Sequence, residues 1–186
     1  MTNKELCERY PWLIPSNRFS GKRITDCAGP DGECGYWPGN PNAHPEYNYE
    51  YTELDEMPKG WRRAFGEEMC EELNNEIITW PPTAQKNFRI TQIKEKWGHL
   101  CFYTNGESAQ FREIIGKYTL RSKYTCINCG EPARWISRGW ISPWCNTCAH
   151  EDFTHINSLY ASETPWEEEY IDINEYYNEI EQEEED

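Results

Sequence analysis

Residues 126–148 read CINCGEPARWISRGWISPWCNTC and contain two Cys-x2-Cys pairs separated by fifteen residues. This spacing lets two pairs of thiolates close a tetrahedron around one metal ion. Four thiolates favour Zn²⁺ over an iron–sulfur cluster, for which a different cysteine spacing is expected. A site made of four protein thiolates leaves no open position for water, so the metal would be structural. The sequence therefore predicts one structural Zn²⁺, held by Cys126, Cys129, Cys145 and Cys148.

The residues around the four cysteines predict a treble-clef-like zinc finger. Gly130 directly follows the first pair and supplies the positive φ that such a knuckle needs. Residues 133–142 predict a β-hairpin that turns at Gly139. Residues 149–160 predict a helix directly after the second pair, because Phe153, Ile156 and Tyr160 have helical spacing. This string resembles a GATA-type finger in architecture over about 25 residues, but acidic residues follow Cys148 where that finger carries a basic segment.

Upstream of the finger, the sequence predicts a small α+β body. Residues 88–104 alternate between apolar and polar side chains around Trp97-Gly98, which predicts a β-hairpin. Two amphipathic helices flank this hairpin, and their apolar positions are Trp61, Phe65, Met69, Leu73 and Ile77 in the first and Phe111, Ile114, Ile115 and Tyr118 in the second. The first helix also carries a row of acidic side chains, interpreted as a solvated face or a partner site: Glu67, Glu68, Glu71, Glu72 and Glu76.

The chain divides into three parts by composition. Residues 1–124 form the body, 125–162 the four-cysteine module and 163–186 an acidic tail. The tail opens with Thr164-Pro165-Trp166-Glu167, a capping box with proline at the first helical position. A narrow apolar stripe follows at helical spacing, so the tail predicts an acidic amphipathic helix that either docks on the body or binds a partner.

The formal net charge of −15 is unevenly distributed. Residues 85–148 hold ten basic and four acidic side chains, whereas residues 163–186 hold twelve acidic side chains and no Lys or Arg. Such a dipolar chain can attract partners at either end. No long apolar run and no secretory signal opens the chain, so the sequence predicts a cytoplasmic protein without a membrane partner.

A second resemblance covers most of residues 10–150. The segments that carry it are Tyr51-Thr52-Glu53-Leu54-Asp55, Pro58-x-Gly60-Trp61-Arg62, Phe65-Gly66-Glu67-x-Met69-Cys70, Gln92-Ile93-Lys94-Glu95-Lys96-Trp97-Gly98 and the four-cysteine module. With these segments the chain resembles a family of small uncharacterised proteins from phages and prophages of gut bacteria. The resemblance implies the cytoplasm of a bacterial host as the setting, and it implies no biochemical activity.

Residues 27–46 look like an insertion relative to that family. This segment contains Cys27, Cys34 and His44, which could form a second metal loop. The alternative is a plain surface loop, favoured by the Gly, Pro and Asn content and by a ligand spacing that fits no standard pair.

The sequence favours a non-enzymatic function, because the chain has no P-loop, nucleophile elbow, dinucleotide fingerprint or paired-histidine metal motif. The first alternative is an inhibitor or adaptor whose acidic surface occupies a basic, nucleic-acid-binding site on a host protein, such as a component of a defence system. The acidic residues proposed for this contact lie in the tail: Glu167, Glu168, Glu169, Asp172, Glu175 and Glu179.

Two further alternatives remain open. The basic, aromatic-rich segment 85–148 predicts nucleic-acid or nucleotide binding. Its candidate phosphate contacts are Arg89, Lys94, Lys96, Arg134 and Arg138. The last alternative is a structural or assembly protein of the phage particle that acts by oligomerisation.

Overall fold

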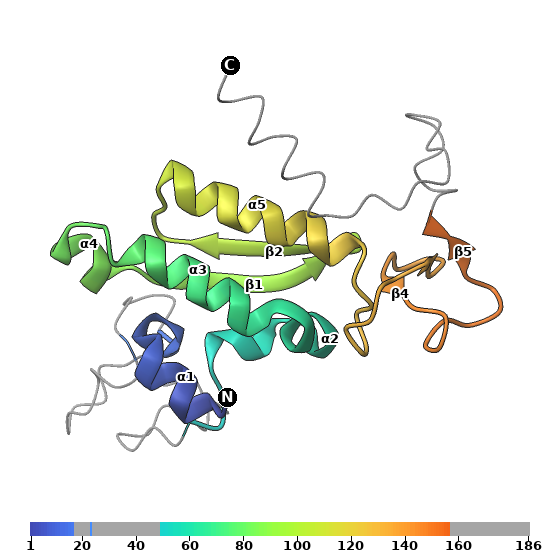
Figure 1. Cartoon of the computed structure of the whole chain (residues 1–186), viewed down its shortest axis with the longest axis horizontal. Helices are drawn as coiled ribbons and strands as arrows, with labels where there is room; N and C mark the ends of the chain where they lie inside the picture. The colour runs from blue at the N-terminus through green and yellow to red at the C-terminus, as the bar shows by residue number, and fades with distance from the viewer. Residues whose placement is uncertain (17–22, 24–48, 157–186) are drawn as a thin grey trace.

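The computed structural model describes residues 1–16, 23 and 49–156 of the chain. Two helices, α3 (Glu67–Ile77) and α5 (Ala109–Lys123), pack together beside a hairpin of β1 (Ile90–Lys96) and β2 (His99–Thr104) (Figure 1). The remaining elements of the body are α1 (Asn3–Arg9), η1 (Pro11–Leu13), η3 (Glu53–Glu56), α2 (Lys59–Trp61), η4 (Arg62–Gly66) and α4 (Pro82–Asn87). The predicted α+β class is confirmed.

The helix predicted from the spacing of Trp61 to Ile77 is present, with one irregular turn. α2 continues through η4, a π-helical turn, into α3. The five apolar residues repeat every fourth position, a pattern that drifts by about 40° per repeat on an α-helix of 3.6 residues per turn. The wider π turn offsets part of this drift. All five side chains are consequently buried.

Aromatic rings fill the core between the helices and the hairpin. Phe111 of α5 contacts Trp80, Phe88 and Phe102, with ring centroids 5.4 to 6.2 Å apart. Such tilted and edge-on pairs stabilise a core beyond the area that they bury. The N-terminal α1, which the sequence analysis missed, adds Leu6 to the same core.

The predicted β-hairpin is confirmed, and its turn has unusual geometry. β1 pairs antiparallel with β2 from Lys96↔His99 to Ile90↔Thr104, with an irregularity between Ile90 and Gln92. Both turn residues have positive φ, 55° at Trp97 and 79° at Gly98. Glycine adopts this region freely, but a side chain such as that of Trp97 pays about 1–2 kcal/mol there.

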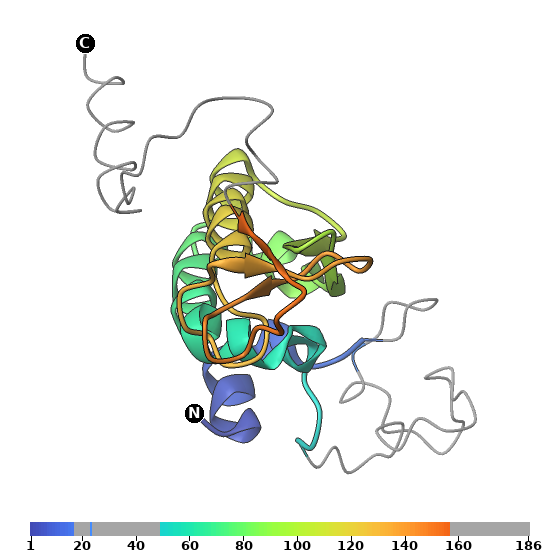
Figure 2. The same ribbon diagram turned by 90° about the vertical axis from the view of Figure 1, so that its right-hand side faces the viewer.

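One face of the hairpin packs on the core and the other does not. Ile93, Leu100 and Phe102 are buried on the core side. Figure 2 shows α3 and α5 on that side of the strands, with no described helix across from them. Because strand side chains alternate and paired residues point to the same side, the opposite face is shared by six residues. We call this the open face: Gln92, Lys94, Lys96, His99, Cys101 and Tyr103.

The four-cysteine module contains a small antiparallel sheet. Its strands are β3 (Trp135–Ile136), β4 (Pro143–Trp144) and β5 (Thr154–His155), in the order β4-β3-β5. The predicted hairpin forms between β3 and β4, with φ of 81° at Gly139 in its connection. Its second strand begins after residue 142, because Ser137 binds the carbonyls of Trp140 and Ser142 and closes a longer loop.

The helix predicted directly after Cys148 is wrong for residues 149–155. Turns lead instead into β5, which pairs with the free edge of β3, and Ile156 N–H donates to Arg134 O at 2.9 Å. An unpaired strand edge leaves backbone groups unsatisfied, so pairing with β5 competes with local helix formation. Up to Ile156 the module therefore differs from the predicted treble clef, because a third strand follows the second cysteine pair.

Two predicted segments lie outside the described residues. They are the 27–46 insertion with Cys27, Cys34 and His44, and the acidic tail 163–186 with its six proposed contact residues. Both stay predictions. Within the described ranges, no helix is long and apolar enough to cross a membrane.

Candidate metal centre and hairpin surface

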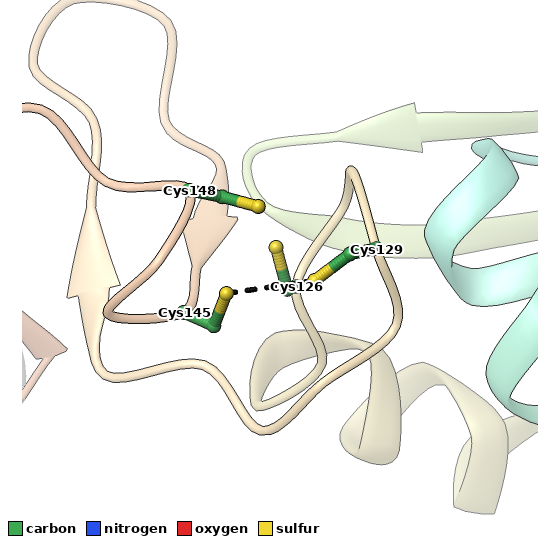
Figure 3. A group of neighbouring side chains, drawn as sticks. All are labelled: Cys126, Cys129, Cys145 and Cys148. Carbon is green, nitrogen blue, oxygen red and sulfur yellow. Dashed lines mark hydrogen bonds between the residues drawn. The ribbon is translucent and has the colours of Figure 1, made fainter.

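The four predicted metal ligands come together at the end of α5. The Sγ atoms of Cys126, Cys129, Cys145 and Cys148 all lie within 4.8 Å of one another, and those of Cys129 and Cys145 are 3.5 Å apart. Figure 3 shows the side chains converging from two loops. Sulfurs bound tetrahedrally at about 2.3 Å from a metal lie about 3.8 Å apart, so the cluster has the dimensions of a four-thiolate metal site.

Each cysteine pair sits on a tight backbone turn. In the first turn, Gly130 N–H donates to Cys126 O at 3.0 Å, and φ at Gly130 is 86°, as predicted. In the second, the N–H groups of Cys148 and Ala149 both donate to Cys145 O. These bonds fix the backbone, so the two sulfurs of each pair point to one side.

Hydrogen bonds to sulfur prepare the site for a cation. Burial raises the pKa of the Cys126 thiol, but N–H groups of Cys129, Cys145 and Asn128 outweigh burial and lower this pKa to about 7. At Cys129, the N–H of Glu131 lowers the pKa, while burial and hydrogen bonds among the thiols together raise it to about 12. Crowded thiolates repel one another, and a divalent cation offsets that repulsion.

Asn128 is a supporting residue that the sequence analysis missed. Its Nδ2 donates to Cys148 Sγ at 3.3 Å and so links the first turn to a ligand of the second. Contacts of this kind orient metal ligands and tune the site. The sequence feature that could have identified Asn128 is its position between the two cysteines of the first Cys-x2-Cys pair.

The first cysteine turn is docked on the body at Gly60. Gly60 N–H donates to Ile127 O at 3.0 Å, and Trp61 Nε1 donates to Thr125 O at 2.8 Å. A Cβ at Gly60 would lie 2.2 Å from Cys126 O, which is closer than any real contact. Only glycine permits this approach, so the metal ligands and α2 are held together directly.

The acidic face of the first helix is engaged within the molecule. All five carboxylates have intramolecular partners: Glu67 with the Met1 amine, Glu68 with Arg121, Glu71 with Arg9 and Tyr10, Glu72 with Lys117 and Tyr118, and Glu76 with Trp80 and Ser108. Burial, together with its bond to Glu72, raises the pKa of Tyr118 and keeps that phenol a donor. The interpretation as a merely solvated face is therefore incomplete, because these side chains tie α3 to α1 and α5.

The predicted basic contacts do not form one cluster. Lys94 and Lys96 share the open face, and Lys94 Nζ lies 5.3 Å from the ring centroid of Tyr103. Arg138 is exposed in the β3–β4 connection, and its Nε donates to Thr154 Oγ1 at 3.4 Å. Arg89 lies at the far end of β1, and Arg134 is exposed beside β3. The structure thus brings together only part of the predicted set.

Cations on the two sides of the body differ in their partners. Arg9, Lys117 and Arg121 on the helical side each pair with a glutamate of α3. Lys94 and Lys96 form no ion pair with any acidic side chain of the described residues. Within the described part of the chain, no carboxylate therefore neutralises these two charges.

Comparison with known proteins gave no match to a protein-family model, to a curated protein or to a solved structure. The resemblance to a phage protein family therefore stays a prediction.

Proposed function

We propose that this chain is a non-enzymatic nucleic-acid-binding protein that uses the open face of the β1–β2 hairpin. The observation that carries the proposal is the pair Lys94 and Lys96, which lie together on the open face and have no acidic partner among the described residues. Phosphates are the anions that such lysines recognise through charge, and Tyr103 on the same face adds an exposed ring for stacking.

We further propose that Zn²⁺ is the ion held by the four cysteines. A set of four thiolates, two of them buried and two half-buried, matches the structural sites that Zn²⁺ prefers, and it leaves no ligand position for substrate. The ion would fix the module against Gly60 and would have no part in a reaction. This supports a binding function over a catalytic one.

The inhibitor hypothesis, with an acidic surface that occupies a basic site on a host protein, rests on the tail. Those residues lie outside the described part of the chain, and the acidic face of α3 has internal partners. The hypothesis stays a prediction, as do the phage setting and the assembly alternative. Removing residues 163–186 separates the two functions, because the inhibitor would lose its partner whereas nucleic-acid binding would persist.

The test is binding of labelled single-stranded and duplex DNA to the full chain over a range of salt concentrations, measured by fluorescence anisotropy. Replacing Lys94 and Lys96 by Gln should weaken binding and reduce the salt slope by about 1.4 for single strands or about 1.8 for duplex, because two phosphate contacts are lost. The matched control replaces Lys4 and Lys86, which are exposed on α1 and α4. Equal losses in both double variants, or no binding at low salt, would contradict the proposal.

A further inference from the structure

Trp97 occupies a backbone position that favours Gly or Asn over a bulky side chain. It stands at the tip of the β1–β2 turn with φ of 55°, and 65% of its surface is exposed. Turns of this kind favour Asn-Gly, because both central residues need positive φ. A bulky side chain that is strained and mostly exposed gains little from folding, and such outliers point to function.

A second exposed indole lies next to this turn. Trp140, in the β3–β4 connection, is 72% exposed, and its Nε1 donates to Glu95 Oε2 at 2.6 Å. The other oxygen, Oε1 of Glu95, accepts the N–H of Gly98 at 2.7 Å. One carboxylate therefore holds both the hairpin turn and the tip of the module's loop. The sequence analysis missed this role of Glu95.

The two tips are in direct contact. A Cβ at Gly98 would lie 3.2 Å from Cγ2 of Ile141, which follows Trp140 in the chain. Two residues separated by more than forty positions, Trp97 and Trp140, thus present their rings from neighbouring loops. Lys96 precedes the first ring and Arg138 stands two residues before the second, and both are exposed.

We propose that Trp97 and Trp140 form a stacking platform for unpaired bases, so that the preferred ligand is a single-stranded nucleic acid. This inference rests on the proposed nucleic-acid-binding function. Indole rings stack on any base whose face is free, and the flanking cations neutralise the adjacent phosphates. A duplex hides its base faces inside the stack, so it would reach only the cations.

Charge favours this ligand over an apolar protein surface. Lys96 is the chain neighbour of Trp97, and Arg138 stands two residues before Trp140. Glu95, the carboxylate that contacts both tips, is occupied by Trp140 and Gly98. An apolar partner would leave these cations facing a surface without counter-charge. A single strand supplies bases and phosphates together.

The test compares the full chain with Trp97→Asn, using labelled DNA of roughly 20 nucleotides, longer than a typical site of 4–16. Asn tolerates positive φ, so the variant should melt about 2–4 °C higher while its affinity for the single strand falls about 5- to 100-fold. Duplex binding should change little. A residue with a merely structural role would lose stability instead.

Trp140→Leu should also weaken single-strand binding. Ile78→Asn is the matched control for Trp97→Asn. Ile78 is 60% exposed at the end of α3, so its replacement removes a similar apolar surface elsewhere. If the single strand and the duplex bind equally well, and Trp97→Asn binds both like the unmodified chain, the platform is wrong while the proposed function stands. If neither nucleic acid binds, the proposed function fails and the platform fails with it.

Discussion

The body and the four-cysteine module are stabilised by different means. In the body, Trp61, Phe65, Phe111 and Tyr118 are among many large side chains that are fully buried in one continuous core. Within the described part of the module, the buried apolar cluster contains only Ala133, Ile136 and Ile156, with Ile141 packed against them. The body can hold its fold by apolar burial, whereas the module needs another source of stability.

We propose that a metal ion held by the four cysteines is that source. Full burial of an isoleucine contributes about 1.5–3 kcal/mol, whereas a structural zinc contributes about 10–16 kcal/mol in finger peptides. The ligands also supply the link to the body, because Cys126 O and Ile127 O lie against Gly60. The contrast between a core-stabilised body and a module that we propose to be metal-stabilised leads to four predictions.

The largest effect is expected from Cys126→Ser. Losing one of four thiolates should abolish stoichiometric metal binding and unfold the module, because the remaining apolar cluster is too small to replace about 10–16 kcal/mol. Elemental analysis should find no Zn²⁺, and amide exchange should show loss of protection in residues 125–156. Chelator treatment of the unmodified chain should give the same result.

Cys101→Ser is the matched control for that experiment. Cys101 lies on the open face and belongs to no metal cluster of the described residues. Metal content and melting temperature should therefore stay unchanged. An unaltered melting temperature in Cys126→Ser would contradict the contrast between body and module, because the module would then be stable with only three of its four ligands.

An intermediate effect is expected from Phe111→Ala. Phe111 is fully buried and contacts Trp80, Phe88 and Phe102, so its removal should cost about 3–5 kcal/mol of unfolding free energy. Metal content should remain stoichiometric below the new melting transition. Denaturant unfolding followed together with metal release checks both parts, and loss of metal in the native variant would show that the two regions are not distinct.

Local patterns were enough to predict much of the body. The apolar spacing at Trp61–Ile77 and Phe111–Tyr118 predicted two helices, because a helix buries one stripe of its own sequence. The capping box at Thr2 and Glu5 carried the signal for α1, but the short segment has little apolar periodicity. The helix predicted after Cys148 failed because β3 offered a free edge, and that competition depends on tertiary contacts.

The candidate site also has one part that local sequence patterns predicted and another part that depends on tertiary contacts. Cysteine spacing predicted the four ligands, because a Cys-x2-Cys turn is itself local. Gly60 beside Cys126 O and Glu71 beside Tyr10 join residues more than sixty positions apart, and no pattern within either segment predicts such a pairing. The exposure of Trp97 and Trp140 could not be predicted either, because the sequence does not distinguish an exposed tryptophan from a buried one.

A smaller effect is expected at the contact between the two regions. In Gly60→Ala, the new Cβ would lie 2.2 Å from Cys126 O and 2.6 Å from Ile127 O, both of them backbone atoms that cannot rotate away. Overpacking of this kind costs about 1–3 kcal/mol. The first cysteine turn should move off α2, so the melting temperature should fall, and Zn²⁺ should exchange faster with a competing chelator.

The smallest effect, and of opposite sign, is expected from Gly116→Ala, the matched control for Gly60→Ala. Gly116 lies within α5, is exposed, and a Cβ there would meet no atom within 4 Å. Replacing glycine by alanine inside a helix should therefore stabilise the chain by about 0.5–1 kcal/mol without changing metal exchange. Two glycines in helical segments thus give opposite results because only one of them touches the metal-bearing turn. If both variants were equally stable and exchanged metal at the same rate, the contact at Gly60 would not couple the body to the metal site, and the two regions would be independent.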